Sequence, residues 1–508
     1  MAVAATAWGR VRGLELAGGI EAFLGIPYAA PPIDGLRLRS PRPAAPWSGE
    51  RDCTATGAAS LQSLAGAQTW LNEPIARQSE DCLFLNVWTP GRAAAHAVLV
   101  WFHGGATRNG HGGSASIDGA RLAREQGIVV VTVNYRLGAL GGLAHPDLAD
   151  EETGECANWG MQDKVAALRW VRENIAAFGG DPARVTIGGQ SSGAANAVLI
   201  AQNPAWRPLF ARVIAQSPPL FQPPMFVELA AAAEYAEALA RRMGASVRGL
   251  REQPGEAILR AEAGWMRDPS FAQAFGRPRT APVRDGRTVA DWPVTGRLAG
   301  VPLLTGWTRD EANFWYRLVA PDGKTLSAFA PPADAAELER EVARLVRLHY
   351  PYPDAPTPAQ AIAAAGGSGD PARTWGELYT SLVFRAPIRH CALRHAARGS
   401  PTYVYEYARP IAPPGEGSPH ACEVPLVFGT LGHPHLAAKV GAGPEADALC
   451  ARMMGRWGAF VREGAPGEWP AFRPDRRAVL RLGAGGGDRV EDDPRHAALA
   501  VWRALYTT

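Results

Sequence analysis

Ser191 stands at the centre of the sequence Gly189-Gln190-Ser191-Ser192-Gly193, which has the pattern G-x-S-x-G. In a sharp turn between a strand and a helix, this pattern exposes the serine hydroxyl as a nucleophile. The glycines are needed because the strand and the helix approach too closely for a Cβ atom. Ser192 is the rival hydroxyl, but only Ser191 is central, so we predict Ser191 as the nucleophile. The alternative is an incidental turn rich in glycine and serine.

A second sequence, residues 101–106 (WFHGGA), ends an apolar run and can stabilise negative charge. A tetrahedral intermediate needs backbone N–H groups that point at its oxyanion, and a glycine-rich loop after a strand can supply them. We expect the N–H groups of Gly105, Ala106 and Ser192 to form this oxyanion hole. An ordinary turn at the end of a strand is the alternative.

The elements around these two sequences alternate between strand and helix. Continuous apolar runs over residues 97–102 and 128–133 predict strands that are buried on both faces, as in a parallel sheet. Apolar residues at helical spacing predict a helix over residues 162–178, ended by Gly179 and Gly180. A turn at Asp181-Pro182, a strand over 185–187 and a helix over 191–200 follow. The sequence therefore predicts an α/β fold whose mostly parallel central sheet is flanked by helices.

The rest of the chain is expected to complete one catalytic domain over residues 1–508. A helix is predicted over 226–243, strands over 301–305, 403–407 and 478–482, and a final helix over 496–506. Residues 366–369 (GGSG) are short enough to be a loop within the domain. We expect helical insertions at about 218–300 and 320–400 to form a cap over a cleft.

Composition limits the choice of partners and of location. The chain has 52 Lys and Arg against 49 Asp and Glu, a formal charge of +3, which argues against nucleic acid as a main partner. Its N-terminus lacks the pattern of a secretory signal, and its apolar runs are far shorter than the roughly 20 residues of a membrane span. We therefore expect a soluble, cytoplasmic protein that does not interact with membranes.

Cysteine and histidine spacing gives no metal site. The six cysteines are scattered without a C-x-x-C pair, which favours reduced thiols. His433 and His435 lie close together, but two histidines without a third ligand do not make a zinc site. We expect neither a metal nor any other cofactor.

Several short sequences, in order along nearly the whole chain, resemble signatures of the type-B carboxylesterase and cholinesterase family of α/β-hydrolases, with its bacterial para-nitrobenzyl-esterase-like members. They are residues 25–32 (GIPYAAPP), 79–83 (SEDCL) with 85–87 (LNV), 158–163 (NWGMQD) and 178–182 (FGGDP). The resemblance implies an α/β-hydrolase fold with helical cap insertions and a serine carboxylesterase.

The same resemblance identifies the acid and the base of a catalytic triad. The family's acid is a glutamate in a motif that residues 306–311 (GWTRDE) match, which implies Glu311; the sequence by itself leaves Asp310 open. Residues 419–429 (PHACEVPLVFG) match its histidine motif, which implies His420. The order Ser191, Glu311, His420 is the one expected of this fold. Ser217 matches a family serine that supports the acid.

Three departures from the family pattern fall inside the expected site. Most relatives carry glycine where Ala106 stands, alanine at Ser192 and glutamate at Gln190. The alanine Cβ restricts the backbone of the oxyanion loop. The loss of the glutamate removes a fixed negative charge, so we expect a preference for neutral, largely apolar esters over choline-like cations.

Other matched positions are expected to be structural. Arg37 and Glu80 match an ion pair of the family. Cys82 matches a cysteine that is disulfide-bonded in secreted members, but the partner cysteine is missing here. Cys422 is expected to be buried and inert. Trp101, Trp159, Trp307 and Trp315 lie near the motifs, and aromatic residues of this kind are expected to line an apolar cleft.

The implied mechanism is acyl transfer through a serine. His420 takes the proton of Ser191, Glu311 orients the imidazole, and water hydrolyses the acyl-enzyme. The expected partners are a small-molecule ester and water, with the protein a monomer or a homodimer. The alternatives are an amide, carbamate or lactone hydrolase, an acyltransferase with the same triad, or a non-catalytic scaffold of this fold.

Overall fold

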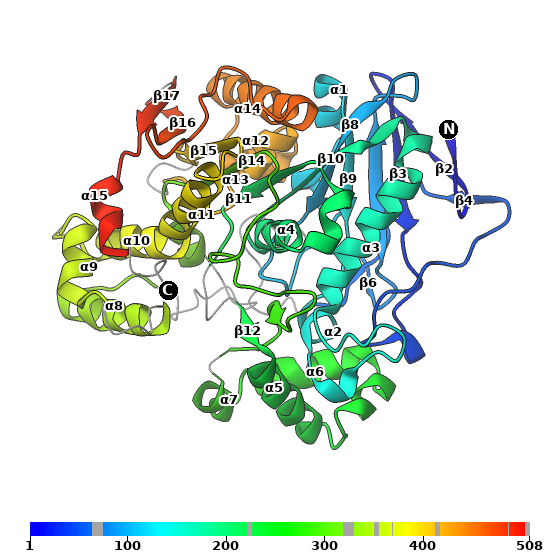
Figure 1. The fold of residues 1–508 in the computed structure, drawn as a ribbon, viewed down its shortest axis with the longest axis horizontal. Coiled ribbons are helices and arrows are strands. Elements are labelled where there is room, and N and C mark those ends of the chain that lie inside the picture. Colours follow the sequence, from blue (N-terminus) through cyan, green and yellow to red (C-terminus); the bar gives the residue numbers. More distant parts are fainter. Residues whose placement is uncertain are drawn as a thin grey trace.

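A sheet of 13 strands forms the centre of the protein (Figure 1). The computed structural model describes residues 1–62, 75–220, 226–275, 277–317, 330–349, 355–367, 369–411, 417–485 and 487–502. In spatial order the strands are β1 (Ala2–Thr6), β2 (Gly9–Leu16), β3 (Ile20–Pro27), β7 (Phe84–Thr89), β9 (Val129–Val133), β8 (His96–Phe102), β10 (Gly180–Gln190), β11 (Arg212–Gln216), β14 (Leu303–Thr308), β15 (Thr402–Tyr407), β16 (Ala478–Ala484) and β17 (Gly487–Asp492), and β4 (Glu50–Asp52) pairs with β2.

The sheet is mostly parallel, as predicted. Strands β9, β8, β10, β11, β14, β15 and β16 run parallel to their neighbours in this order, whereas β1, β2, β3, β7 and β17 pair antiparallel along the main order. The carboxyl ends of parallel strands meet at one edge of a sheet, where ligands bind in open α/β folds. Because Ser191, Glu311 and the WFHGGA sequence all follow such strands, they converge on this edge.

Each face of the sheet is covered by helices. Along β8, Val98, Val100 and Phe102 face one apolar cluster, and Ala97, Leu99 and Trp101 face another. The first cluster includes residues of α3 (Trp159–Asn174), α4 (Ser192–Gln202) and α11 (Ala386–Ala396). The second includes residues of α1 (Ala120–Gln126), α12 (Val424–Phe428) and α14 (Pro444–Glu463). This alternation explains why β8 is apolar at every position from Ala97 to Phe102.

Two further groups of helices lie beyond the sheet (Figure 1). Helices α5 (Leu229–Arg242), α6 (Gly255–Trp265) and α7 (Pro269–Ala274), at the bottom of the view, pack with α2 (Gly138–Gly142) around their own apolar cluster. Helices α8 (Ala335–His349), α9 (Pro358–Ala364) and α10 (Pro371–Thr380) lie at the lower left. Among the described helices, no segment combines the length and apolar character that crossing a bilayer requires.

Most predicted elements are present, with shifted ends. The strand predicted over 185–187 begins at Gly180, because Asp181-Pro182 is accommodated as an irregularity in β10 and not as a turn. The helix predicted from residue 226 begins at Leu229, since Val227–Glu228 forms a short strand, β12, paired with β13 (Val283–Arg284). The final predicted helix is found as α15 (His496–Leu499). Residues 503–506 of that helix, residue 368 of the GGSG sequence and parts of the second expected insertion lie outside the described residues.

Candidate active site

Ser191 lies in a tight turn between β10 and α4. It is the N-cap of α4, with φ 56° and ψ −129°, a conformation that is rare for a residue with a side chain. A Cβ atom on Gly193 would lie 2.1 Å from the carbonyl oxygen of Phe102, and one on Gly189 would lie 2.6 Å from the same atom. Both flanking glycines are therefore required by the close approach of β8, as the G-x-S-x-G pattern predicts.

Glu311 and His420 form a buried hydrogen-bonded pair. Glu311 begins the short helix η7 (Glu311–Arg317) after β14, and His420 lies between β15 and α12. His420 Nδ1 lies 2.5 Å from Glu311 Oε2, and the other carboxylate oxygen accepts a hydrogen bond of 2.8 Å from the N–H of Thr308. Because Nδ1 donates to a carboxylate, Nε2 of a neutral His420 is left as the acceptor.

Asp310 is directed away from this pair. Its Oδ2 accepts hydrogen bonds from the N–H of Ser418 at 2.8 Å and from Arg309 Nε at 2.9 Å. Asp310 also lines a separate cavity with Arg309 and Arg373. Of the two adjacent acids, Glu311 is therefore the one that contacts His420.

Gln190 occupies the acceptor nitrogen of His420. Its Nε2 lies 3.0 Å from His420 Nε2, and a carboxamide nitrogen can only donate. The hydroxyl of Ser191 has no hydrogen-bond partner among the described residues. The sequence indicated Gln190 as a residue that supports the catalytic groups and lacks the charge of the family's glutamate, but nothing in it indicated this direct contact with His420.

The loop after β8, residues 105–108, is strained, and we call it the oxyanion loop because the sequence predicts oxyanion donors at Gly105 and Ala106. Gly105, Ala106 and Thr107 have φ values of 112°, 54° and 58°. A Cβ on Gly105 would lie 2.0 Å from the carbonyl oxygen of Asn109, so this position requires glycine. Ala106 adopts the left-handed conformation with a side chain, which costs about 1–2 kcal/mol.

Contacts behind the oxyanion loop hold it in place. The Thr107 N–H donates to Ser192 Oγ at 3.2 Å, and the Thr107 carbonyl accepts from the Gly138 N–H at 2.8 Å. Arg108 forms an ion pair of 3.2 Å with the fully buried Glu262 of α6. No motif marks the hydrogen bond that the Ser192 hydroxyl accepts from Thr107, or the ion pair of Arg108 with Glu262.

Aromatic rings surround His420. The ring centroids of Phe314, Trp315 and Phe384 lie 5.4, 5.3 and 4.9 Å from that of His420. The other expected tryptophans make contacts elsewhere: Trp101 packs on Phe428, Trp159 donates to the Leu143 carbonyl and Trp307 donates to Glu406. Of the four, only Trp315 contacts His420, and its position four residues after Glu311 was the available signal.

A second buried acid lies near the pair. Burial and the neighbouring Glu311 carboxylate raise the pKa of Glu423 to about 7. Glu423 accepts a hydrogen bond of 3.0 Å from Gln216 Nε2. Ser217, expected to support the acid, has a buried hydroxyl without a partner in the described part of the chain. The hydrogen bond that holds Glu311 comes from Thr308 instead.

The remaining matched positions have structural contacts. Arg37 Nε lies 2.5 Å from Glu80 Oε1, and its Nη2 lies 2.7 Å from Oε2, so the expected ion pair is present. All six cysteines lie in the described ranges and are free thiols, and burial raises the pKa of Cys422. Within those ranges, no three His, Cys, Asp or Glu side chains gather where a metal ion could bind.

Comparison with known proteins connects this geometry to a family. The model of the carboxylesterase family matches residues 1–502. The chain is 33% identical to phenmedipham hydrolase of Pseudarthrobacter oxydans over 95% of both chains. It is 31% identical to para-nitrobenzyl esterase of Bacillus subtilis (strain 168), over 97% of this chain and 96% of that one. A solved carboxylesterase structure from Geobacillus stearothermophilus matches with a TM-score of 0.79 and 31% identity, over 100% of both chains.

Proposed function

Because the chain belongs to the carboxylesterase family, with its α/β-hydrolase fold and carboxylic ester hydrolase activity, we propose that Ser191, His420 and Glu311 are its catalytic triad. The observation that carries the proposal is the buried hydrogen bond between His420 and Glu311, next to the strained turn that presents Ser191. Glu311 orients the imidazole and stabilises its cation, as the acid does in a serine triad.

The reaction then proceeds in two acyl-transfer steps. His420 Nε2 takes the Ser191 proton as the serine oxygen bonds to the acyl carbon, and the carbonyl oxygen gains the negative charge. The N–H groups of Gly105, Ala106 and Ser192 receive this oxyanion. Collapse breaks the ester C–O bond, and the imidazolium protonates the leaving alkoxide. A water molecule then attacks the acyl-enzyme through the same steps and releases the carboxylic acid product.

Gln190 must leave His420 before the first step. A neutral imidazole nitrogen has one lone pair, and the carboxamide of Gln190 uses it in this structure. Rotation of the Gln190 side chain away from His420 frees Nε2 for the Ser191 hydroxyl. Before the reaction, the hydrogen bond between Gln190 and His420 is therefore replaced by one from the Ser191 hydroxyl to His420.

The preferred substrates are neutral esters with apolar groups. A carboxamide, and not a carboxylate, lies beside His420, so no negative charge at position 190 attracts a cation. Phe314, Trp315 and Phe384 offer apolar ring surface around the base.

The six free cysteines support a cytoplasmic location, where thiols stay reduced.

Fluorophosphonate labelling followed by peptide mapping tests the nucleophile. The label is expected on Ser191, and Ser191→Ala should lose both the label and the hydrolysis of nitrophenyl esters, by at least a thousandfold. Ser192→Ala is the matched control and should retain the label. Label on another serine, or full activity of Ser191→Ala, would refute the triad.

A second assay tests the substrate class. A choline ester and its uncharged isostere should differ in kcat/KM in favour of the neutral compound. A strong preference for the choline ester would contradict the role given to Gln190 without affecting the triad.

A further inference from the structure

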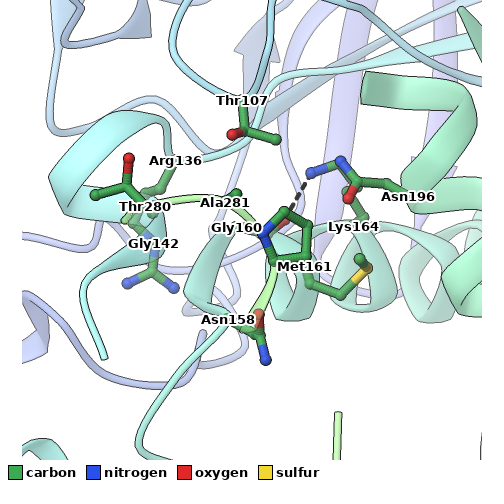
Figure 2. A pocket seen from close by; sticks show the side chains of 12 residues that line it. Thr107, Arg136, Gly142, Asn158, Gly160, Met161, Lys164, Asn196, Thr280 and Ala281 are labelled. Atoms are coloured by element: carbon green, nitrogen blue, oxygen red, sulfur yellow. Dashed lines mark hydrogen bonds between the residues drawn. The ribbon is translucent and has the colours of Figure 1, made fainter. Parts of the chain in front are cut away.

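A small cavity lies behind the oxyanion loop. Its volume is about 20 Å³, which is room for one water molecule or one small ion. Figure 2 shows Thr107 of the loop on one side of the cavity, Asn158 on the opposite side, and Lys164 and Asn196 on a third. Lys164 belongs to α3, and Asn196 lies on α4, one turn beyond Ser192.

Lys164 brings a positive charge to this cavity. The residue is only 1% exposed, and its Nζ donates one hydrogen bond of 2.9 Å, to the carbonyl of Gly160. Nζ also lies 3.2 Å from the ring centroid of Tyr135, which attracts a cation. An ammonium group has three N–H donors, so a donor remains for a ligand in the cavity.

Within the described part of the chain, no carboxylate forms an ion pair with Lys164. None of the described residues that line the cavity is an aspartate or a glutamate. The adjacent Asp163 is held by Arg136, whose Nε and Nη2 lie 2.9 and 2.6 Å from its two oxygens. Burial lowers the pKa of Lys164 to about 7, and the charge of the nearby Asp163 only partly offsets this effect. The local charge therefore favours an anion.

Asn196 supplies a second donor. It is 1% exposed, and its Nδ2 has no hydrogen-bond partner within the described part of the chain. A buried amide without a partner destabilises the folded protein, so such groups are rare unless a ligand or water satisfies them. Water can satisfy the amide of Asn196, whereas an anion also compensates the charge of protonated Lys164.

We propose that this cavity binds a small monovalent anion of the halide class, such as chloride, between Lys164 Nζ and Asn196 Nδ2. The bound anion accepts one hydrogen bond from each and neutralises the buried ammonium group. Thr107 forms part of the wall, and its N–H is bound to Ser192, so the anion also fills the space against which the oxyanion loop rests. The site is separate from the triad and does not depend on it.

Thermal unfolding of the full chain in chloride-free buffer tests the proposal. Sodium chloride is titrated against sodium gluconate at constant ionic strength. We expect a saturable rise of the unfolding midpoint, about 2–3 °C when chloride exceeds its Kd a hundredfold in a chain of this size. An identical response to both salts would refute the site.

Three variants locate the effect. Lys164→Met removes the charge at similar size and should abolish the chloride response. Asn196→Asp places a carboxylate beside Lys164 and should make the protein independent of chloride, which keeps the test decisive if Lys164→Met does not fold. Lys439→Met, on α13 (Pro434–Val440), is the matched control and should keep the response.

Crystals grown with sodium bromide give a direct observation. An anomalous peak is expected in the cavity, within hydrogen-bonding distance of Lys164 Nζ and Asn196 Nδ2. Density for water without an anomalous signal would overturn the proposal. Neither experiment measures ester hydrolysis, so failure here leaves the triad untouched.

Discussion

At the scale of single residues, two contacts of His420 define the site: a hydrogen bond to Glu311 and a hydrogen bond from Gln190. The His420–Glu311 hydrogen bond is short and buried, whereas the Ser191 hydroxyl has no partner among the described residues and Gln190 takes its place on His420. The identity of residue 190 therefore determines which charge the base experiences and which group competes with the nucleophile for it.

Gln190→Glu should shift the pH dependence of the reaction. A carboxylate about 3 Å from His420 favours the imidazolium, which is inactive as a base, so a higher pH is needed to release the proton. We expect the acid limb of kcat/KM against pH to move upward by about one pH unit, which corresponds to about 1.4 kcal/mol. Gln190→Met is the uncharged control and should leave the limb in place; an unmoved limb in Gln190→Glu would count against the contact.

Glu423 should make stability depend on pH. Its pKa is raised to about 7, so between about pH 4.5 and pH 7 the folded protein holds a proton that the unfolded chain releases. Stability from this group is therefore lost as the pH rises through that range. Glu423→Gln resembles the protonated acid and should be more stable than the parent above pH 7, by up to about 3 kcal/mol, with little difference at pH 4.

Urea unfolding midpoints across this pH range measure the effect of Glu423→Gln. The exposed Glu234→Gln is the control and should follow the parent curve. If Glu423→Gln and the parent show the same slope with pH, Glu423 is not protonated in the folded protein.

At the scale of elements, the oxyanion loop is strained on one side and tied down on the other. Its three consecutive positive φ values are held by Ser192 of α4, by Gly138 of α2 and, through Arg108, by Glu262 of α6. The loop geometry is thus set by three helices that are far apart in the sequence.

Ser192→Ala should lower kcat more than it raises KM. Loss of the hydrogen bond from Thr107 costs about 1 kcal/mol of loop positioning, or roughly fivefold in rate. Ser192→Thr keeps the hydroxyl and should restore most of the rate. Ala106→Gly relieves the backbone strain, so Ser192→Ala should lower kcat less in this variant than in the parent protein. An equal loss of kcat in both would show that the two residues act independently.

The sequence predicted the elements of the parallel core better than those at its edges. Strands such as β8 and β9 are buried on both faces and are apolar except at His96 and Thr132, so they stand out without any tertiary information. In β2 the residues alternate between buried and exposed, and Arg10 and Arg12 interrupt the apolar pattern. Propensity also failed at Asp181-Pro182, where neighbouring strands accommodate an irregularity inside β10.

The candidate site was predictable where a motif fixes the backbone and not where contacts are made over long distances. The G-x-S-x-G pattern located the turn at Ser191, and the resemblance selected Glu311, which contacts His420 where Asp310 does not. The bond from Gln190 to His420 depends on a side-chain rotamer, and the ion pair of Arg108 with Glu262 joins residues 154 positions apart. Neither leaves a local signature.

At the scale of the whole molecule, a few buried ion pairs join distant segments. Arg37 binds Glu80 and donates 2.7 Å to the carbonyl of Arg251, while Glu80 accepts from the N–H of Gly255 at the start of α6. The N-terminal part of the chain is thereby fixed to the helical group α5–α7. Both side chains are nearly buried, at 6% and 11% exposure, so the pair is shielded from solvent.

Glu80→Gln should destabilise the whole protein. Removing one member of a buried pair leaves the other charge without compensation, at a cost of about 3–5 kcal/mol. Thermal unfolding should therefore occur several degrees lower, with an unchanged KM for esters. Glu228→Gln, which breaks the exposed pair with Arg284, is the control and should change stability by less than about 1 kcal/mol. Equal midpoints for the two variants would contradict this role of Glu80.

The ion pair of Arg108 with Glu262 also bears on how this enzyme can be redesigned. Segment 226–275 is an attractive unit for recombination libraries, because its helices pack around their own apolar cluster. Yet its residue 262 anchors, through Arg108, the loop that we propose receives the oxyanion. A chimaera whose foreign segment lacks an acidic residue at position 262 leaves Arg108 without its partner, and its oxyanion loop is then held less firmly. Donor segments should therefore be selected first for a carboxylate at this position.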